Sequence, residues 1–145
     1  MDFLTAMKLS SSGLSVQRKR METIASNMAN AETTRTPEGG PYRKKDVVIT
    51  ALPLEDKFGM HLNRELEDQL KQVLVTDIVE DQGKPRMVFN PGHPDANALG
   101  YVAMPNINLV GEMVNMMTAT RSYEANVTAI NATKLMAQRA IDLGR

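Results

Sequence analysis

The placement of proline divides this chain into three zones. All seven prolines fall between Pro37 and Pro105, so both ends lack the residue that most strongly interrupts helices. The pattern predicts a mainly α protein with a small β region. A long N-terminal helix over residues 1–31 and a long C-terminal helix over 107–145 are expected to pair as a coiled-coil-like core. An irregular, β-containing middle region over 32–106 lies between them.

Both ends carry a seam of residues at alternating steps of four and three, the spacing of a helix that packs lengthwise against another helix. The N-terminal seam consists of Phe3, Met7, Ser10, Leu14, Gln17, Met21, Ile24, Met28 and Ala31. The C-terminal seam consists of Leu109, Met113, Met116, Thr120, Tyr123, Val127, Ile130, Lys134, Ala137 and Ile141. The first helix is predicted to end near Asn30. The second is predicted to start with Asn108 as its cap and Glu112 in its first turn, and to stop at Gly144.

The middle region contains short runs of β-prone residues bounded by Gly, Pro or polar residues. These runs predict strands over residues 46–52, 73–79, 86–89 and 101–104. Residues 60–72 carry leucines at helical spacing among charges, and we interpret this stretch as a loop.

Composition excludes several classes of function. Seventeen Lys and Arg balance seventeen Asp and Glu, so no net field would attract nucleic acid or an anionic membrane. The absence of Cys excludes disulfides, thiolate metal sites and cysteine nucleophiles. The first twelve residues do not have the pattern of a secretory signal, and no apolar run approaches the roughly 20 residues of a membrane span.

The helices carry more apolar surface than one partner helix can cover. Residues outside the two seams add to it: Leu9, Val16, Ala25, Ala29, Val110, Val114, Met117, Ala125, Ala129, Leu135 and Met136. A simple helical hairpin would account for the seams alone. The wider surface, together with the many small polar residues of both ends, favours helices that pack against several neighbours.

One place in the chain brings a histidine and a carboxylate close together, at His93 and Asp95 in Pro-Gly-His-Pro-Asp. Metal binding or acid–base chemistry is one interpretation. A rigid turn is favoured instead, because two prolines and a glycine restrict this segment. We therefore predict no catalytic residues, no metal site and no cofactor.

Both ends also contain longer motifs. The N-terminal segment SGLSVQRKRM (12–21) leads into IASNMANAET (24–33), in which Ala29, Asn30 and Thr33 form an Ala-Asn-x-x-Thr element. The C-terminal segment carries NMM (115–117) and RSYEAN (121–126). With these motifs the chain resembles the flagellar axial proteins, a family of rod, hook and hook-associated subunits.

Within this family, segments of the middle region most resemble those of proximal rod subunits. These segments are TRTPEGGPYRKKD (34–46), NPGHPDA (90–96) and GYVAMPN (100–106). The resemblance does not extend to about 54–72, and residues 97–99 are less polar than the family pattern.

The resemblance implies a structural subunit of the bacterial flagellar basal-body rod. Such a subunit leaves the cytoplasm through the flagellar type III export channel without a cleaved signal and polymerises into a hollow shaft that crosses the periplasm. The implied partners are other proximal and distal rod proteins, the adaptor between the rod base and the MS ring, and copies of itself. Nucleic acid, a small-molecule substrate and membrane insertion are not expected.

We expect the assembly interface on the two helices. Its candidate residues are Phe3, Met7, Leu14, Met21, Ile24, Met28, Asn30, Leu109, Met113, Met116, Tyr123, Glu124, Val127, Ile130 and Ile141. Two other functions fit parts of the pattern: a helical-hairpin adaptor or export chaperone, and an enzyme centred on His93 and Asp95.

Overall fold

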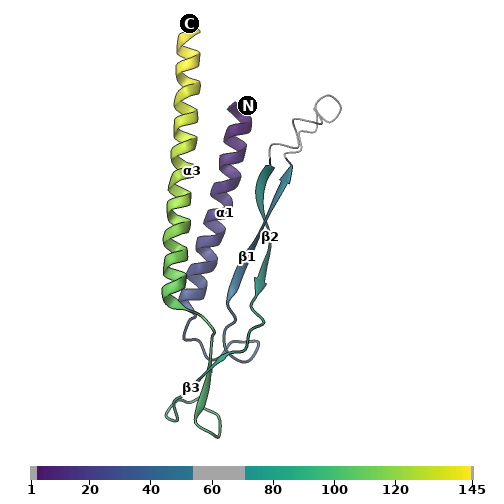
Figure 1. Ribbon diagram of the computed structural model, residues 1–145, viewed down its shortest axis with the longest axis vertical. Coiled ribbons are helices and arrows are strands. Elements are labelled where there is room, and N and C mark those ends of the chain that lie inside the picture. The colour runs from purple at the N-terminus through teal and green to yellow at the C-terminus, as the bar shows by residue number, and fades with distance from the viewer. Residues whose placement is uncertain (1–2, 54–70, 145) are drawn as a thin grey trace.

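The computed structural model describes residues 3–53 and 71–144 (Figure 1). Two long helices run side by side, α1 (Phe3–Ala29) and α3 (Leu109–Leu143). A hairpin of β1 (Lys45–Pro53) and β2 (Lys71–Glu80) lies along α1, so that α1 stands between α3 and the hairpin. A shorter hairpin, β3 (Arg86–Phe89) and β4 (Tyr101–Met104), lies at the end of the molecule opposite both termini. The predicted class, mainly α with a small β region, is confirmed.

The helices are antiparallel. Gly13 lies against Asn126, and the side chain of Asn27 reaches Glu112, so residue numbers rise on one helix as they fall on the other. Continuing this register brings Phe3 level with Met136. The last two turns or so of α3 therefore extend beyond the start of α1, as Figure 1 shows.

Both ends of α3 and the end of α1 follow the sequence signals. Asn108 Oδ1 accepts a hydrogen bond from the Gly111 N–H at 3.1 Å, and the Gly144 N–H donates to Ile141 O at 3.1 Å. At the end of α1, Asn30 Nδ2 donates to Ser26 O at 2.9 Å, and Thr33 Oγ1 donates to Asn30 Oδ1 at 3.2 Å. The Ala-Asn-x-x-Thr element thus closes the first helix.

The strands form two separate antiparallel pairs. The β1–β2 register runs from Lys45↔Glu80 to Pro53↔Lys71, with a shift between Val48 and Ile49. All four predicted strands are present, although β1 and β2 are longer than expected. The predicted loop over 60–72 is wrong at its end, because residues 71–72 pair with β1 and begin β2. Residues 60–70 lie outside the described part of the chain.

The apolar core is small and centred on α1. Val16 and Ile24 of α1, Ala119 of α3 and Val102 of β4 are its buried members. Within residues 3–53 and 71–144, three polar side chains are buried as well, namely Thr23, Asn27 and Glu112. A core this small leaves most of the apolar surface of α3 outside it.

Candidate assembly site

Small side chains form the contact between α1 and α3. Ala119 is fully buried, and a Cβ placed on Gly13 would lie 2.9 Å from Asn126 Nδ2. About two turns further along α1, Thr120 Oγ1 approaches Met21 Sδ to 3.6 Å. At these positions the helices therefore approach closely through Gly, Ala, Asn and Thr.

The structure distributes the fifteen candidate residues over three environments. Ile24 is buried at 5% exposure. Nine are partly buried: Met7, Leu14, Met21, Met28, Asn30, Met116, Tyr123, Val127 and Ile130. Five are exposed: Phe3, Leu109, Met113, Glu124 and Ile141. On α3 the predicted seam residues Met116, Tyr123, Val127 and Ile130 are partly buried, whereas Leu109, Met113 and Ile141 are exposed. Glu112, Ala119 and Asn126, which lie outside the predicted seam, also face α1.

An apolar stripe on α3 is left uncovered by the described chain. Val110, Val114 and Met117 recur at helical spacing and are between 57% and 69% exposed. Leu135 and Met136 continue the exposed apolar surface toward the end of the helix. Contiguous apolar surface of this kind typically marks a contact with another macromolecule.

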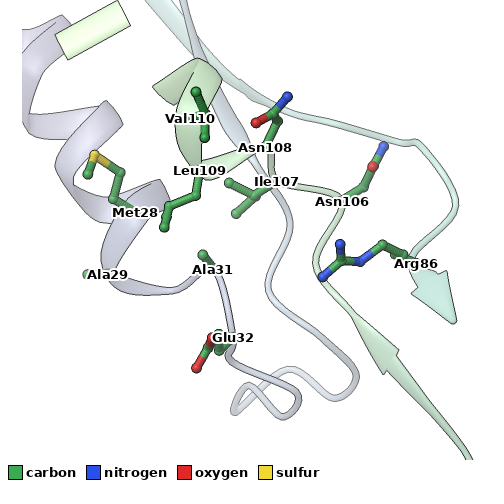
Figure 2. Close-up of a pocket in the computed structure, with 10 residues that line it drawn as sticks. All are labelled: Met28, Ala29, Ala31, Glu32, Arg86, Asn106, Ile107, Asn108, Leu109 and Val110. Atoms are coloured by element: carbon green, nitrogen blue, oxygen red, sulfur yellow. The ribbon is translucent and has the colours of Figure 1, made fainter. Parts of the chain in front are cut away.

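A groove of about 590 Å³ opens where the end of α1 meets the start of α3 (Figure 2). Met28, Ile107, Leu109 and Val110 supply its apolar lining, and Glu32 and Arg86 add a charge of each sign. Figure 2 shows Leu109 on the α3 side close to Met28 on the α1 side. Two candidate assembly residues therefore meet in one concave surface that leads into the α3 stripe.

Next to this groove, the side chain of Asn27 joins α1 to the start of β1. The Lys45 N–H donates to Asn27 Oδ1 at 2.8 Å, and Asn27 Nδ2 donates to Lys45 O at 2.8 Å. The hydroxyl of Tyr42 donates to the same Oδ1 at 3.1 Å. Since Asn27 is 1% exposed, these bonds satisfy an amide that would otherwise be costly to bury.

Glu112 brings α3 into the same junction. Its Oε2 accepts from Asn27 Nδ2 at 3.3 Å, and its Oε1 lies 3.3 Å from Lys44 Nζ. Lys44 also pairs with Asp46 at 3.4 Å. Burial, the largest single influence, lowers the pKa of Lys44, but the carboxylates of Glu112 and Asp46 together outweigh it. The pKa of Lys44 is therefore raised above its ordinary value of 10.5.

Sequence reasoning missed this polar junction. Glu112 is expected from the sequence only as a favourable charge near the helix N-terminus, and the structure buries it to 4% exposure. Asn27 lies inside the N-terminal motif, between the seam residues Ile24 and Met28, and a polar residue at such a position is a signal for a specific partner. That partner, the backbone of Lys45, carries no side-chain pattern that a sequence could reveal.

The His93 and Asp95 segment forms a turn. The Asp95 N–H donates to His93 Nδ1 at 3.1 Å, and Thr34 Oγ1 donates to Asp95 Oδ2 at 2.8 Å. Asp95 thus ties the tip of the β3–β4 hairpin to the loop that follows α1. Over the described residues, no group of three or more His, Cys, Asp or Glu is placed to hold a metal ion. Neither described helix has the length and apolarity of a membrane span.

Comparison with known proteins gives matches at both ends and over the full length. Residues 7–35 match the family model described as Flagella basal body rod protein, and residues 98–143 match Flagellar basal body rod FlgEFG protein C-terminal. The flagellar basal-body rod protein FlgC of Yersinia enterocolitica is 41% identical, with 100% of both chains covered. FlgC of Salmonella typhimurium is 40% identical over 100% of both chains, and FlgC of Bacillus subtilis is 41% identical over 97% of both.

Proposed function

This chain belongs to the FlgC family of flagellar basal-body rod proteins and is a structural rod subunit, and we propose that it assembles through the outer surfaces of its helix pair. In this proposal it polymerises with other proximal and distal rod proteins, with the adaptor at the MS ring and with copies of itself. The resulting hollow shaft carries motor torque to the hook and filament. The subunit catalyses no reaction.

The observation that carries this proposal is the uncovered apolar surface of α3. Val110, Val114 and Met117 lie on one face, and the overhanging end adds Ile141 and Leu143 at 68% and 89% exposure. A shaft with helical symmetry needs heterologous contacts, in which one surface of a subunit meets a different surface of the next. The groove around Met28 and Leu109 and the overhanging end of α3 are two unlike surfaces at opposite ends of the helix pair.

The location proposed for the subunit is the part of the rod that crosses the periplasm, reached by export without a cleaved signal. The family resemblance supports this route. The intact mass of the subunit extracted from purified basal bodies tests it. A mass that includes the first residues, with or without the initiator methionine, supports unprocessed export, and a mass that lacks an N-terminal segment contradicts it.

A chromosomal deletion tests the function itself. Deleted cells should be non-motile, and electron microscopy of their basal bodies should show rings without rod, hook or filament. Complementation with the wild-type gene should restore swimming. Deleted cells that swim would contradict the proposal, and so would a subunit found only in the cytoplasm after fractionation.

Substitution of one exposed residue tests the assembly surface separately. Val114→Asp places a charge in the α3 stripe at a site that is 57% exposed, so the fold should persist while rod assembly is lost. Asn131→Asp is the matched control, because it adds the same charge on an exposed polar position of α3. Equal motility of the two strains would mean that the α3 stripe is not an assembly surface.

A further inference from the structure

Glu112 is a buried carboxylate at the contact between α3 and α1. A carboxylate that is 4% exposed is costly unless it is paired and hydrogen-bonded, and an apolar residue would pack against α1 without that cost. Its two oxygens face two different parts of the chain. One accepts from Asn27 of α1, and the other pairs with Lys44, the residue immediately before β1.

The β1–β2 hairpin rests on α1, and its link to α3 is narrow. Both strands pack along α1, where Val16 and the β2 residues Val73 and Val75 line the same groove. Among the described hydrogen bonds and ion pairs, Glu112 makes the connection from α3 to the segment that enters β1. Asn27 stands between them, since it binds Glu112 with the same amide that holds the Lys45 backbone.

We propose that Glu112 is a positioning residue that makes the placement of the β1–β2 hairpin depend on the pairing of α1 with α3. With α3 in place, Glu112 fixes both Asn27 and Lys44. Without α3, Asp46 is the ion-pair partner that Lys44 keeps among the described residues, and the Asp46 side chain is 67% exposed. Asn27 also loses one of its partners. The inference rests on the proposed function: a rod subunit completes its outer surface only when its terminal helices are paired.

The absence of cysteine makes a direct test possible. A Cβ at position 13 would lie 3.4 Å from Asn126 Cγ, so cysteines at positions 13 and 126 would be direct neighbours across the helix pair. The double variant Gly13→Cys/Asn126→Cys can therefore be studied in full length, with the helices joined by oxidation or free to separate after reduction. Hydrogen exchange in mild urea then reports protection of residues 45–53 and 71–80.

In the Gly13→Cys/Asn126→Cys variant with Glu112 intact, which we call the parent, oxidation should slow amide exchange of both hairpin strands by about tenfold. A change of this size corresponds to the loss of one charge-assisted hydrogen bond. Adding Glu112→Gln keeps the size of the side chain and removes its charge. In that variant oxidation should still slow exchange in α1 and α3, but should change hairpin exchange by less than about twofold.

Glu80→Gln is the matched control. It removes the same charge from an ion pair with Lys45 whose side chains are 41% and 40% exposed, and oxidation should protect the hairpin there as in the parent. The inference is overturned if oxidation protects the hairpin equally with and without the Glu112 charge. If Glu112→Gln does not fold, Lys44→Gln removes the same ion pair from the hairpin side. Hairpin exchange in its oxidised and reduced forms then tests the inference in the same way.

Failure of this inference is distinguishable from failure of the proposed function. Exchange in the purified chain does not depend on rod assembly, whereas the gene deletion does not depend on Glu112. Unchanged hairpin exchange together with rod-less deleted cells would refute the positioning role alone. Swimming deleted cells would refute the proposed function and leave the exchange result standing.

Discussion

The two helices carry the same four-three period, yet they occupy different environments. α1 is covered on two sides, by α3 and by the β1–β2 hairpin, and it contributes Val16, Thr23, Ile24 and Asn27 to the buried residues. α3 is eight residues longer, at 35 against 27, and contributes only Glu112 and Ala119. A repeating seam therefore shows that a helix has partners, but not whether those partners belong to the same chain.

A charge on the covered face of α1 should cause the largest loss of stability. Ile24→Asp places a charge at a site that is 5% exposed, and unfolding should become easier by about 4 kcal/mol or more, because a buried unpaired charge is among the costliest substitutions. Urea unfolding followed by circular dichroism measures the loss. Val114→Asp on α3 should cost less than about 1 kcal/mol, and similar losses in the two variants would contradict the distinction between the helices.

Asn27 tests whether the covered face of α1 depends on polar bonds. Asn27→Leu keeps a similar volume but leaves the Lys45 N–H and C=O without this partner and Glu112 with one fewer donor. The expected cost is about 2–3 kcal/mol in the free energy of unfolding. The same substitution at the exposed Asn131 is the control. A loss no larger than that of the control would mean that apolar packing alone holds β1 to α1.

Gly13 tests the close approach of the helices. Gly13→Leu inserts a large side chain where even a Cβ lies 2.9 Å from Asn126, so we expect a loss of about 1–3 kcal/mol despite the better helix propensity of leucine. Thermal unfolding measures it. Combination with Asn126→Ala should recover part of the loss by making space. An additive loss in the combined variant would place the strain elsewhere.

The smallest expected effect is a pH dependence from Lys44. Its pKa in the folded chain is raised above 10.5, so its pairing stabilises fully below that pH. Stability is then lost as pH rises through the raised pKa, because the unfolded chain releases this proton first. Urea unfolding at pH 9 and at strongly alkaline pH should show a smaller decline in Lys44→Gln than in the wild type. Equal declines would mean that the Lys44–Glu112 pair contributes no measurable stability.

Much of the fold could be predicted from the sequence, because its signals are local. Proline placement, the Asn108 cap and the β-prone runs each depend on neighbouring residues. The full set of α3 residues that face α1 could not be predicted in the same way. The large apolar residues and the small residues of α3 repeat with nearly the same period, so either set could have faced α1. Ala119 and Asn126 face α1 although they lie outside the predicted seam, and their small side chains allow close contact there.

The candidate assembly site could likewise be predicted in its apolar residues but not in its long-range polar contacts. The sequence predicts which residues are apolar on each helix, and the structure shows that Leu109, Met113 and Ile141 are exposed while Ile24 is buried. The burial and pairing of Glu112 could not be predicted, because its partners lie 85 residues away at Asn27 and 68 residues away at Lys44. Long-range polar contacts of this kind leave no periodic trace in the sequence.

The overhang of α3 has a geometric consequence for any stack of such subunits. One end of the helix pair is a single projecting helix with Ile141 and Leu143 exposed, and the other end is a shared concave surface around Met28 and Leu109. Subunits joined through these unlike ends must all point the same way. A shaft built by that contact has polarity, so its two tips are chemically different and a newly arriving subunit meets only one of the two surfaces.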